Sequence, residues 1–295
     1  MALLQHACVE DPAQNLRTVC DMARDAAGRG AELVVTQELF ASPYFCVTED
    51  PAAFDLAEPV PGPATQTLAD LARQLGVAIS ASLFERRAAG LYHNTSVLLG
   101  PDGRMRGKYR KMHIPDDPSY LEKYYFTPGD LGFDAFALHD RPAAPRVGML
   151  VCWDQWFPEA ARLTAMRGAE VLLYPTAIGA HRDDSPADHA AQRDAWITVQ
   201  KSHAIANGLF VAAANRIGRE GPNTFWGSSF ICDPLGRTLA QASADQPEIL
   251  TATLDLDHIE SARRHWNLFF RDRRPDVYAG LTQRWLDDPA APNKR

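Results

Sequence analysis

The amino-acid sequence predicts an α/β protein in which layers of strands and helices pack on one another. Short apolar runs of strand length alternate with segments whose apolar residues follow helical spacing, and the order of these elements recurs after residue 145. The chain has 295 residues, of which 46% are hydrophobic and 23% are charged, as is typical of a globular protein with a large core. We therefore expect a single domain over 1–295, built from two halves of similar element order.

The first half shows clear boundaries between strands and helices. Asp11 and Pro12 open a helix whose apolar residues recur every three or four positions until Gly28, and Gly76 ends a second helix. The two runs that flank a turn at 88–90 are expected to pair as a hairpin. The expected strands are 2–9, 33–36, 77–85, 91–100 and 104–111, and the expected helices are 12–28 and 65–74.

The second half repeats this order with different residues. A helix is expected from Pro158, because proline suits the first turn of a helix, and a long helix is expected around 189–207. The run 182–194 is expected to be a solvated loop and helix start, in which Ser185 and Pro186 suit a helix entry. The expected strands are 147–152, 170–177, 209–216 and 228–237.

Charge and hydropathy exclude several classes of partner. The formal net charge is −7, from 30 basic and 37 acidic residues, and no long basic run is present, so we expect no nucleic-acid partner. No apolar run approaches the roughly 20 residues that a membrane span requires. The start of the chain lacks the basic and apolar regions of a signal peptide, so we expect a cytoplasmic protein.

The cysteines are expected to be reduced thiols. They are five in number, scattered and never arranged as CxxC, which argues against a disulfide framework or a structural zinc site. The nine histidines are also scattered, so we expect no metal. Any one of the five thiols is therefore a candidate nucleophile and has to be judged on its surroundings. The cysteines are Cys8, Cys20, Cys46, Cys152 and Cys232.

Three residues at the ends of predicted strands carry chemistry-bearing side chains. They are Glu38, Lys111 and Cys152. Loops at strand ends can hold polar groups on a rigid scaffold, which makes these positions candidates for a site. Each also has a plain structural interpretation: a buried structural thiol, a solvated surface lysine, and a helix-capping or surface acid.

Cys152 lies at a strand-to-helix elbow, because it closes an apolar strand and precedes Pro158 by six positions. A thiol at such an elbow lies near free backbone N–H groups. We expect these groups to lower the pKa of the thiol and to bind an oxyanion later in a reaction.

Taken together, the three residues and their flanking sequences resemble the nitrilase superfamily over almost the full chain. The motifs are TQELF around Glu38, YRKMHIP around Lys111 and VCWDQWFPEAARL around Cys152, in the order and with the spacing of that family. The resemblance implies a four-layer αββα sandwich that forms a homo-oligomer and needs no cofactor. The aromatic and basic C-terminal tail from about residue 266 is expected to pack on a neighbouring subunit.

Longer blocks, at 111–133, 152–163, 192–208 and 225–230, resemble the N-carbamoylputrescine amidohydrolases of this superfamily. That resemblance implies hydrolysis of N-carbamoylputrescine to putrescine, carbon dioxide and ammonia through a cysteine thioester, as in polyamine biosynthesis from agmatine. In the expected mechanism Glu38 is the general base and later the acid, Cys152 attacks, and Lys111 with the Trp153 N–H binds the oxyanion. Glu122 matches a supporting glutamate of the family; its structural alternative is a surface acid paired with Lys123.

The positions after the nucleophile favour a substrate with an amine tail. Relatives that act on carboxylate-bearing substrates place arginine three or four positions after the cysteine, whereas this chain has Gln155 and Trp156 there. An indole ring can face an ammonium group, although aromatic residues more often fill a core. The substrate-binding residues are expected to be Tyr124, Trp153, Asp154, Trp156, Thr176, Ala177 and Trp226, with Asp154 also a candidate anchor for its own loop.

Two other classes of function compete with this interpretation. One is another enzyme of the superfamily, such as an N-carbamoyl amino acid amidase, an ω-amidase or an aliphatic nitrilase. The missing arginine speaks against the ω-amidase. The other is a non-catalytic scaffold that kept the fold, which the presence of all three catalytic residue types speaks against.

Overall fold

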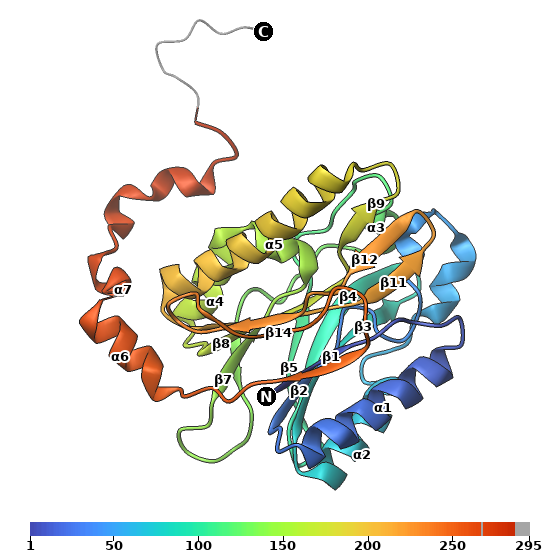
Figure 1. Cartoon of the computed structure of the whole chain (residues 1–295), viewed down its shortest axis with the longest axis horizontal. Helices are drawn as coiled ribbons and strands as arrows, with labels where there is room; N and C mark the ends of the chain where they lie inside the picture. Colours follow the sequence, from blue (N-terminus) through green and yellow to red (C-terminus); the bar gives the residue numbers. More distant parts are fainter. Residues whose placement is uncertain (267, 287–295) are drawn as a thin grey trace, which may run out of the picture.

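The computed structural model describes residues 1–266 and 268–286, and its centre consists of two mixed sheets (Figure 1). The first sheet has the strand order β15-β1-β2-β3-β4-β5. Strands β1, β2 and β3 are parallel, β3, β4 and β5 form an antiparallel meander, and β15 is antiparallel to β1. The bounds are β1 (Ala2–Gln5), β2 (Leu33–Val35), β3 (Ala78–Ala88), β4 (Leu91–Leu99), β5 (Met105–Arg110) and β15 (Glu248–Thr251).

The second sheet repeats the first, with the strand order β14-β13-β10-β8-β7-β6. Here β7, β8 and β10 are parallel, β13 and β14 continue as an antiparallel meander, and β6 is antiparallel to β7. The predicted likeness of the two halves is therefore present in the topology. The bounds are β6 (Ala135–Ala137), β7 (Arg146–Met149), β8 (Val171–Thr176), β10 (Phe210–Asn215), β13 (Phe230–Cys232) and β14 (Thr238–Gln241).

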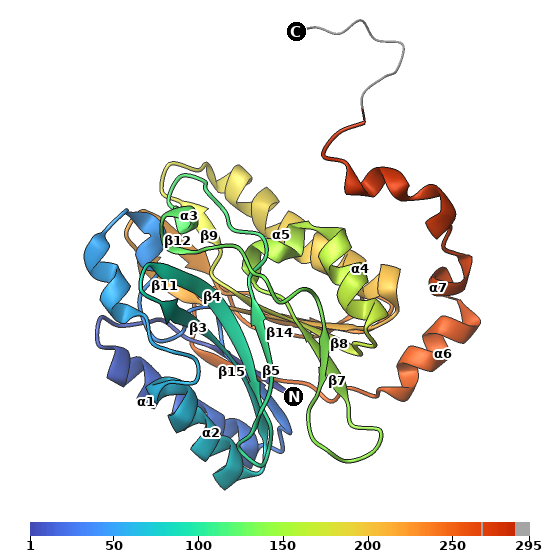
Figure 2. The ribbon, with the colours of Figure 1, turned by 180° about the vertical axis from the view of Figure 1, so that it is seen from behind.

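Helices cover the outer face of each sheet, which gives the four-layer αββα sandwich (Figures 1 and 2). Helices α1 (Pro12–Gly28) and α2 (Pro63–Leu75) pack on the first sheet, and α4 (Pro158–Met166) and α5 (Pro186–Asn207) pack on the second. Within the two described ranges, no helix has the length and apolar content needed to span a bilayer.

Alternation along the strands divides the core between the layers. In β1, Ala2 and Leu4 pack with α1 and α2, whereas Leu3 joins the cluster that contains the second sheet. In β4, Leu98 faces that second sheet while its neighbours Val97 and Leu99 face the helices. Both faces of the parallel strands β2, β8 and β10 are buried, so these strands appear in the sequence as largely apolar runs.

The predicted helix boundaries follow local capping chemistry. The Asp11 side chain accepts a hydrogen bond from Ala13 N at 2.9 Å at the start of α1, and Ser185 Oγ accepts one from Asp188 N at 3.1 Å at the start of α5. Gly76 and Gly208 end α2 and α5 in the left-handed region, with φ of 68° and 55°.

Several elements differ from those predicted. The first strand ends at Gln5 rather than near residue 9. A separate three-stranded sheet of β11, β12 and β9 was not predicted, because its strands are only three or four residues long and lack an apolar alternation. Helix α3 (Glu122–Tyr125) is a single turn. The bounds of the added strands are β9 (Gly179–His181), β11 (Ile217–Glu220) and β12 (Asn223–Trp226).

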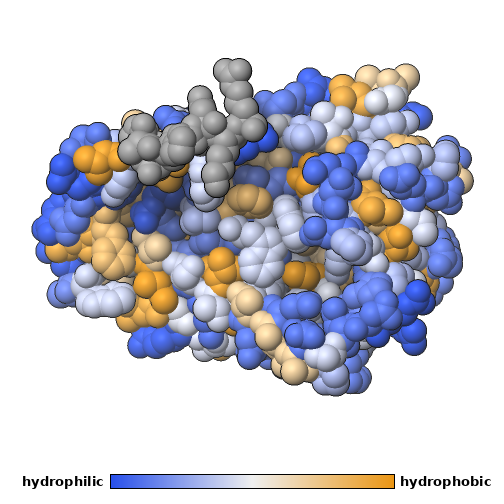
Figure 3. Space-filling model, turned by 90° about the horizontal axis from the view of Figure 1, so that it is seen from above, coloured by the Kyte–Doolittle hydropathy of each residue, from blue (hydrophilic) through white to orange (hydrophobic). Residues whose placement is uncertain are grey.

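The C-terminal segment lies outside the sandwich, on the side of α4 and α5 (Figures 1 and 2). It contains α6 (Asp257–His265), α7 (Phe269–Asp272) and two short 3₁₀ turns, Pro275–Val277 and Ala279–Thr282. We call residues 268–286 the arm. Its large apolar side chains are widely exposed, Leu281 by 66% and Trp285 by 79%, and hydrophobic groups are visible on this side of the surface (Figure 3). The remainder of the predicted tail, 267 and 287–295, lies outside the described residues.

Gly148→Ala is expected to lower the stability of the protein. An added Cβ would lie 2.1 Å from Thr164 Cγ2 and 2.9 Å from Leu172 Cδ2, so β7 and α4 would have to move apart. We expect a loss of about 1–3 kcal/mol, measured by chemical denaturation. Gly28→Ala is the matched control, because nothing lies within 4 Å of its added Cβ, and it should be neutral or slightly stabilising. Equal stability of both variants would show that the α4–β7 interface has spare room.

Candidate active site

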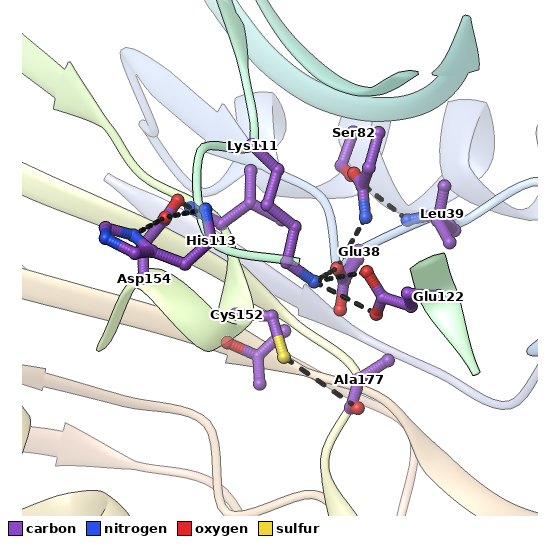
Figure 4. A network of polar contacts seen from close by, with 12 residues as sticks. Glu38, Leu39, Ser82, Lys111, His113, Glu122, Cys152, Asp154 and Ala177 are labelled. Carbon is purple, nitrogen blue, oxygen red and sulfur yellow. Dashed lines mark hydrogen bonds and ion pairs between the residues drawn. The ribbon is translucent and has the colours of Figure 1, made fainter. Parts of the chain in front are cut away.

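Glu38, Lys111 and Cys152 meet at one edge of the sandwich, beyond the carboxyl ends of β2, β5 and β7 (Figure 4). The exposed fractions of Glu38 and Lys111 are 0%, and that of Cys152 is 3%. Lys111 Nζ donates to Glu38 Oε1 at 2.8 Å. The structure therefore brings together the three side chains that the sequence singled out, and it excludes the solvated alternatives for the acid and the lysine.

Lys111 is a buried cation held between two carboxylates. Besides Glu38, its Nζ contacts Glu122 Oε2 at 2.7 Å and Oε1 at 3.0 Å. Burial alone would lower the pKa of this amine, but the charges of Glu122 and Glu38 outweigh burial and raise the pKa well above its ordinary value. The side chain is therefore a permanent ammonium group, with a fixed place and charge.

Glu122 is a buried partner of Lys111 and not a surface acid. It is 0% exposed, and Tyr44 Oη donates to its Oε1 at 2.6 Å. Its alternative partner, Lys123, lies on the surface instead, 3.8 Å from Asp116. Burial raises the pKa of Glu122 to about 7, against the opposing effect of Lys111 and with a further increase from Glu38.

Glu38 has one oxygen committed and one free. Oε1 accepts hydrogen bonds from Lys111 Nζ and from Asn94 Nδ2, the latter at 2.7 Å. Oε2 is buried and has no hydrogen-bond partner among the residues that the structure describes. A buried carboxylate oxygen without a partner is costly, and such groups are often found where a substrate or a reacting proton completes the site.

Cys152 occupies the predicted elbow in a strained backbone conformation. Its φ is 41°, and it begins a 3₁₀ turn, Cys152–Trp156, that leads into α4. Only a few per cent of non-glycine residues have a positive φ, and such strain is often found at functional sites. The first N–H groups of a helical turn have no carbonyl partner within the turn, so the turn itself does not use the Trp153 N–H.

The expected lowering of the pKa of Cys152 was wrong. Burial raises the pKa of this thiol well above its ordinary value, the charge of Glu38 raises it further, and Lys111 only partly opposes them. The backbone N–H groups at the elbow do not outweigh burial and the nearby carboxylate. The resting residue is therefore a neutral thiol, which must lose its proton to a base before it can attack.

Asp154 anchors the loop after the nucleophile and does not line the pocket. Its Oδ2 accepts hydrogen bonds from Tyr109 Oη at 2.8 Å and from Val151 N at 2.9 Å, and its Oδ1 contacts His113 Nδ1 at 2.7 Å. The carboxylate is fully buried, so all of these contacts hold the Cys152 elbow against β5. This corrects the expectation that Asp154 binds substrate, and it agrees with the alternative that Asp154 holds its own loop.

A pocket of about 550 Å³ opens above the Cys152 thiol. Four of the expected binding residues line it: Trp153, Trp156, Ala177 and Trp226. Besides Asp154, two of the expected binding residues lie outside this pocket. Tyr124 packs against Phe54 on a different surface, and the Thr176 hydroxyl turns inward to donate to Tyr174 O at 3.0 Å.

The pocket wall also contains residues that were not predicted, and four of these carry titratable side chains. They are Asp117, Tyr120, His181 and Asp184. The run that contains Asp184 was expected to be a solvated loop and helix start; the helix start is present, but Asp184 lines the pocket. The signal available in the sequence was the pair of acidic residues directly before the helix start at Ser185.

Of the two positions used to predict substrate charge, only one faces the pocket. Trp156 lines it, whereas Gln155 is fully buried and its Oε1 accepts a hydrogen bond from Trp196 Nε1 at 2.8 Å. An arginine could therefore bind a substrate carboxylate from position 156 but not from position 155 without displacing Trp196.

Comparisons with known proteins agree with this fold. A carbon-nitrogen hydrolase family model matches residues 1–264. The N-carbamoylputrescine amidase of Solanum lycopersicum is 44% identical over 290 residues, which cover 95% of this chain and 94% of that protein. The citrullinase of Francisella tularensis subsp. tularensis is 40% identical, with 97% and 98% covered. The crystal structure of a carbon-nitrogen hydrolase from Helicobacter pylori G27 has a TM-score of 0.92 at 45% identity and covers 97% of this chain and 98% of its own.

The chain therefore belongs to the carbon-nitrogen hydrolase family. The predicted nitrilase-type sandwich is confirmed by the structural similarity. The protein is a hydrolase that cleaves carbon–nitrogen bonds.

Glu38→Gln is expected to lower the pKa of Cys152. The charge of Glu38 contributes to raising that pKa, and the amide keeps the shape of the side chain while Lys111 stays in place. The pH dependence of Cys152 alkylation by a neutral haloacetamide, followed by mass spectrometry, measures the change; the midpoint should move to lower pH. Glu10→Gln, at an exposed position, is the control and should leave the midpoint unchanged. A midpoint in Glu38→Gln at or above that of the wild type would contradict the coupling.

Proposed function

We propose that the protein hydrolyses N-carbamoylputrescine to putrescine, carbon dioxide and ammonia. The observation that carries this proposal is the charge of the pocket above Cys152. Two carboxylates, Asp117 and Asp184, lie on its wall, and no lysine or arginine does among the described lining residues. A substrate with a neutral ureido group and a cationic tail fits this charge. The relative from Solanum lycopersicum, an N-carbamoylputrescine amidase, supports the same assignment.

Acylation of the cysteine requires three groups that the site supplies. Glu38, through its free Oε2, takes the proton of the Cys152 thiol, and the sulfur attacks the carbamoyl carbon. The Lys111 ammonium and the Trp153 N–H stabilise the oxygen of the tetrahedral intermediate. Glu38 returns its proton to the leaving nitrogen, so that ammonia departs and an S-carbamoyl thioester remains. Glu122 holds Lys111 throughout.

Hydrolysis of the thioester uses the same acid a second time. Glu38 removes a proton from water, the water oxygen attacks the thioester carbon, and the sulfur leaves as the Cys152 thiol. The product is a carbamic acid, which decomposes to carbon dioxide and the free amine. Glu38→Gln is therefore expected to lower kcat by about 10²–10⁴-fold, since general acid–base catalysis contributes in that range.

L-citrulline is a second candidate substrate, because one relative is named a citrullinase and His181 lies on the pocket wall beside Asp184. Citrulline carries the same ureido group as N-carbamoylputrescine, but its tail has a carboxylate as well as an ammonium group. His181 Nδ1 lies 3.4 Å from the carboxylate of Asp183, and the imidazole could contact a carboxylate on the substrate. The absence of a fixed guanidinium on the wall favours the purely cationic tail.

Ammonia release from a panel of substrates distinguishes these candidates. We expect the highest kcat/KM for N-carbamoylputrescine, with lower values for L-citrulline, N-carbamoyl-β-alanine, an ω-amide and an aliphatic nitrile. Each assay is run with and without a chelator. A preference for N-carbamoyl-β-alanine or the ω-amide would refute the assignment of an amine-tailed substrate, and Cys152→Ala should abolish every activity.

Asp184→Asn is expected to raise KM for N-carbamoylputrescine by a factor of about two to ten, with little effect on kcat, because a partly exposed ion pair contributes roughly 1 kcal/mol. Hydrolysis of N-butylurea, whose tail is uncharged, should be unaffected. Asp183→Asn is the matched control, since the side chain of Asp183 is 79% exposed and does not line the pocket. A KM that rises equally for both substrates would place the effect of Asp184 in the loop and not in charge recognition.

We also propose a cytoplasmic homo-oligomer in which the arm packs on a second copy of the chain. All five cysteines are free thiols, as suits a reducing compartment. The arm exposes large apolar side chains that the body of the same chain does not cover, and contact with a second subunit would bury them. They are Val277, Leu281, Trp285 and Leu286, exposed by 64–79%.

A chain truncated after His265 tests the role of the arm. We expect light scattering coupled to size-exclusion chromatography to report a lower oligomer mass for the truncated chain than for the full chain. Far-ultraviolet circular dichroism should remain native, because α6 and the sandwich are retained. An unchanged oligomer mass would refute the proposed contact.

A further inference from the structure

Arg216 is a buried arginine whose contacts lie directly behind the candidate active site. It follows β10 in the second half of the chain and has an exposed fraction of 0%. A buried guanidinium without hydrogen-bond acceptors would be strongly destabilising. The acceptors of Arg216 therefore indicate which parts of the structure this residue stabilises. None of the motifs in the sequence pointed to it.

The guanidinium binds the backbone that carries Glu38. Nη2 donates to Glu38 O at 2.7 Å and to Leu39 O at 3.1 Å, and Nη1 donates to Ser42 O at 3.3 Å. This stretch follows β2 and is outside the sheet, so a strand ladder does not fix its conformation. Leu39 has a φ of 46°, a strained value for a non-glycine residue, which persists only where the surroundings impose it.

A second route leads from the same arginine to the other carboxylate of the site. Nη1 contacts Glu220 Oε2 at 2.9 Å and Oε1 at 3.1 Å. Glu220 Oε2 in turn accepts a hydrogen bond from Tyr44 N, and Tyr44 Oη donates to Glu122 Oε1 at 2.6 Å. The guanidinium also lies 5.8 Å from the centre of the Tyr44 ring. A continuous path of contacts therefore joins Arg216 and Glu220 to Glu122 and Lys111.

We propose that Arg216, paired with Glu220, is a positioning residue that fixes Glu38 through its backbone and Glu122 through Tyr44. Arg216 lies between β10 and β11 and Glu220 ends β11, both in the second half, whereas both carboxylates and Lys111 come from the first half. Cys152 also belongs to the second half, so Arg216 sets the distance between the base and the nucleophile across the two halves. This inference rests on the proposed function only in taking Glu38 as the base for Cys152.

The two paths of contacts from Arg216 end on Glu38 and on Glu122. We expect the positions of these two carboxylates to affect the rate of catalysis more than the affinity for substrate. The wall residues proposed to bind the substrate tail are not among those that the Arg216 guanidinium contacts. A shift of about 1 Å in a reacting group can reduce a rate by about 10²-fold while substrate binding changes little. Loss of Arg216 should therefore affect kcat and not KM.

The test compares Arg216→Ala, Arg216→Lys and Glu220→Gln with wild type and with Arg219→Ala, an exposed neighbour that serves as the matched control. Steady-state kinetics use whichever ureido substrate the wild type turns over. We expect kcat of Arg216→Ala to fall by about 10²-fold with KM within threefold, and added guanidinium ion to restore at least a tenth of the lost rate. The kcat values of Arg216→Lys and Glu220→Gln should lie between those of Arg216→Ala and wild type, and the kcat of Arg219→Ala should equal that of wild type.

A second measurement keeps the test independent of the substrate. The rate of Cys152 alkylation by a neutral haloacetamide is measured against pH in the same variants. Displacement of Glu38 in the Arg216 variants should shift the midpoint of this pH dependence, and Arg219→Ala should leave the midpoint unchanged. If Arg216→Ala is insoluble, Arg216→Lys and Glu220→Gln carry the same comparison. Wild-type kcat and an unmoved alkylation midpoint in the folded Arg216 variants would overturn the proposal. Failure of N-carbamoylputrescine as substrate would refute the proposed function alone.

Discussion

The burial of one ammonium group, that of Lys111, is the constraint on which the rest of the active site depends. An amine with an exposed fraction of 0% cannot remain charged without close negative partners, and here Glu38 and Glu122 both lie within 3.0 Å of it. Two carboxylates so close together would repel each other without the cation, so none of the three groups is stable in this arrangement alone. The fold has to bring all three together from separate elements, and the resulting charged cluster surrounds a thiol that is neutral at rest.

Much of the fold could be predicted from the sequence, because local chemistry and periodicity specify it. The ends of α2 and α5 coincide with Gly76 and Gly208, and the buried parallel strands β2, β8 and β10 appear as largely apolar runs. Glu38, Lys111 and Cys152 stood out because strand ends on a rigid sheet often carry functional groups. The three-stranded sheet of β9, β11 and β12 was missed because strands this short carry no periodic signal and are formed by pairing between distant segments.

Other features of the site depend on surroundings that the sequence does not reveal. The predicted direction of the Cys152 pKa shift was wrong because burial and the charge of Glu38 outweigh the local N–H groups. Glu38 lies more than a hundred positions earlier in the chain. Asp154 was expected to face the pocket, but long-range partners such as Tyr109 turn it inward. Arg216 was missed for the same reason, because three of its acceptors are backbone carbonyls more than 170 positions away in the sequence. Backbone acceptors leave no trace in residue identity.

The pairing of β15 with β1 has a consequence for how the chain folds during synthesis. β1 is made first, yet its outer edge is completed only by residues 248–251, and Met1 N donates to Ala252 O across a separation of 251 positions. Until that point the outer edge of β1 is unpaired, and an unpaired strand edge can associate with other chains. The first sheet is therefore completed only after every strand of the second sheet has been made. Contacts this distant in sequence slow folding, and the open edge of β1 is available to other chains until β15 pairs with it.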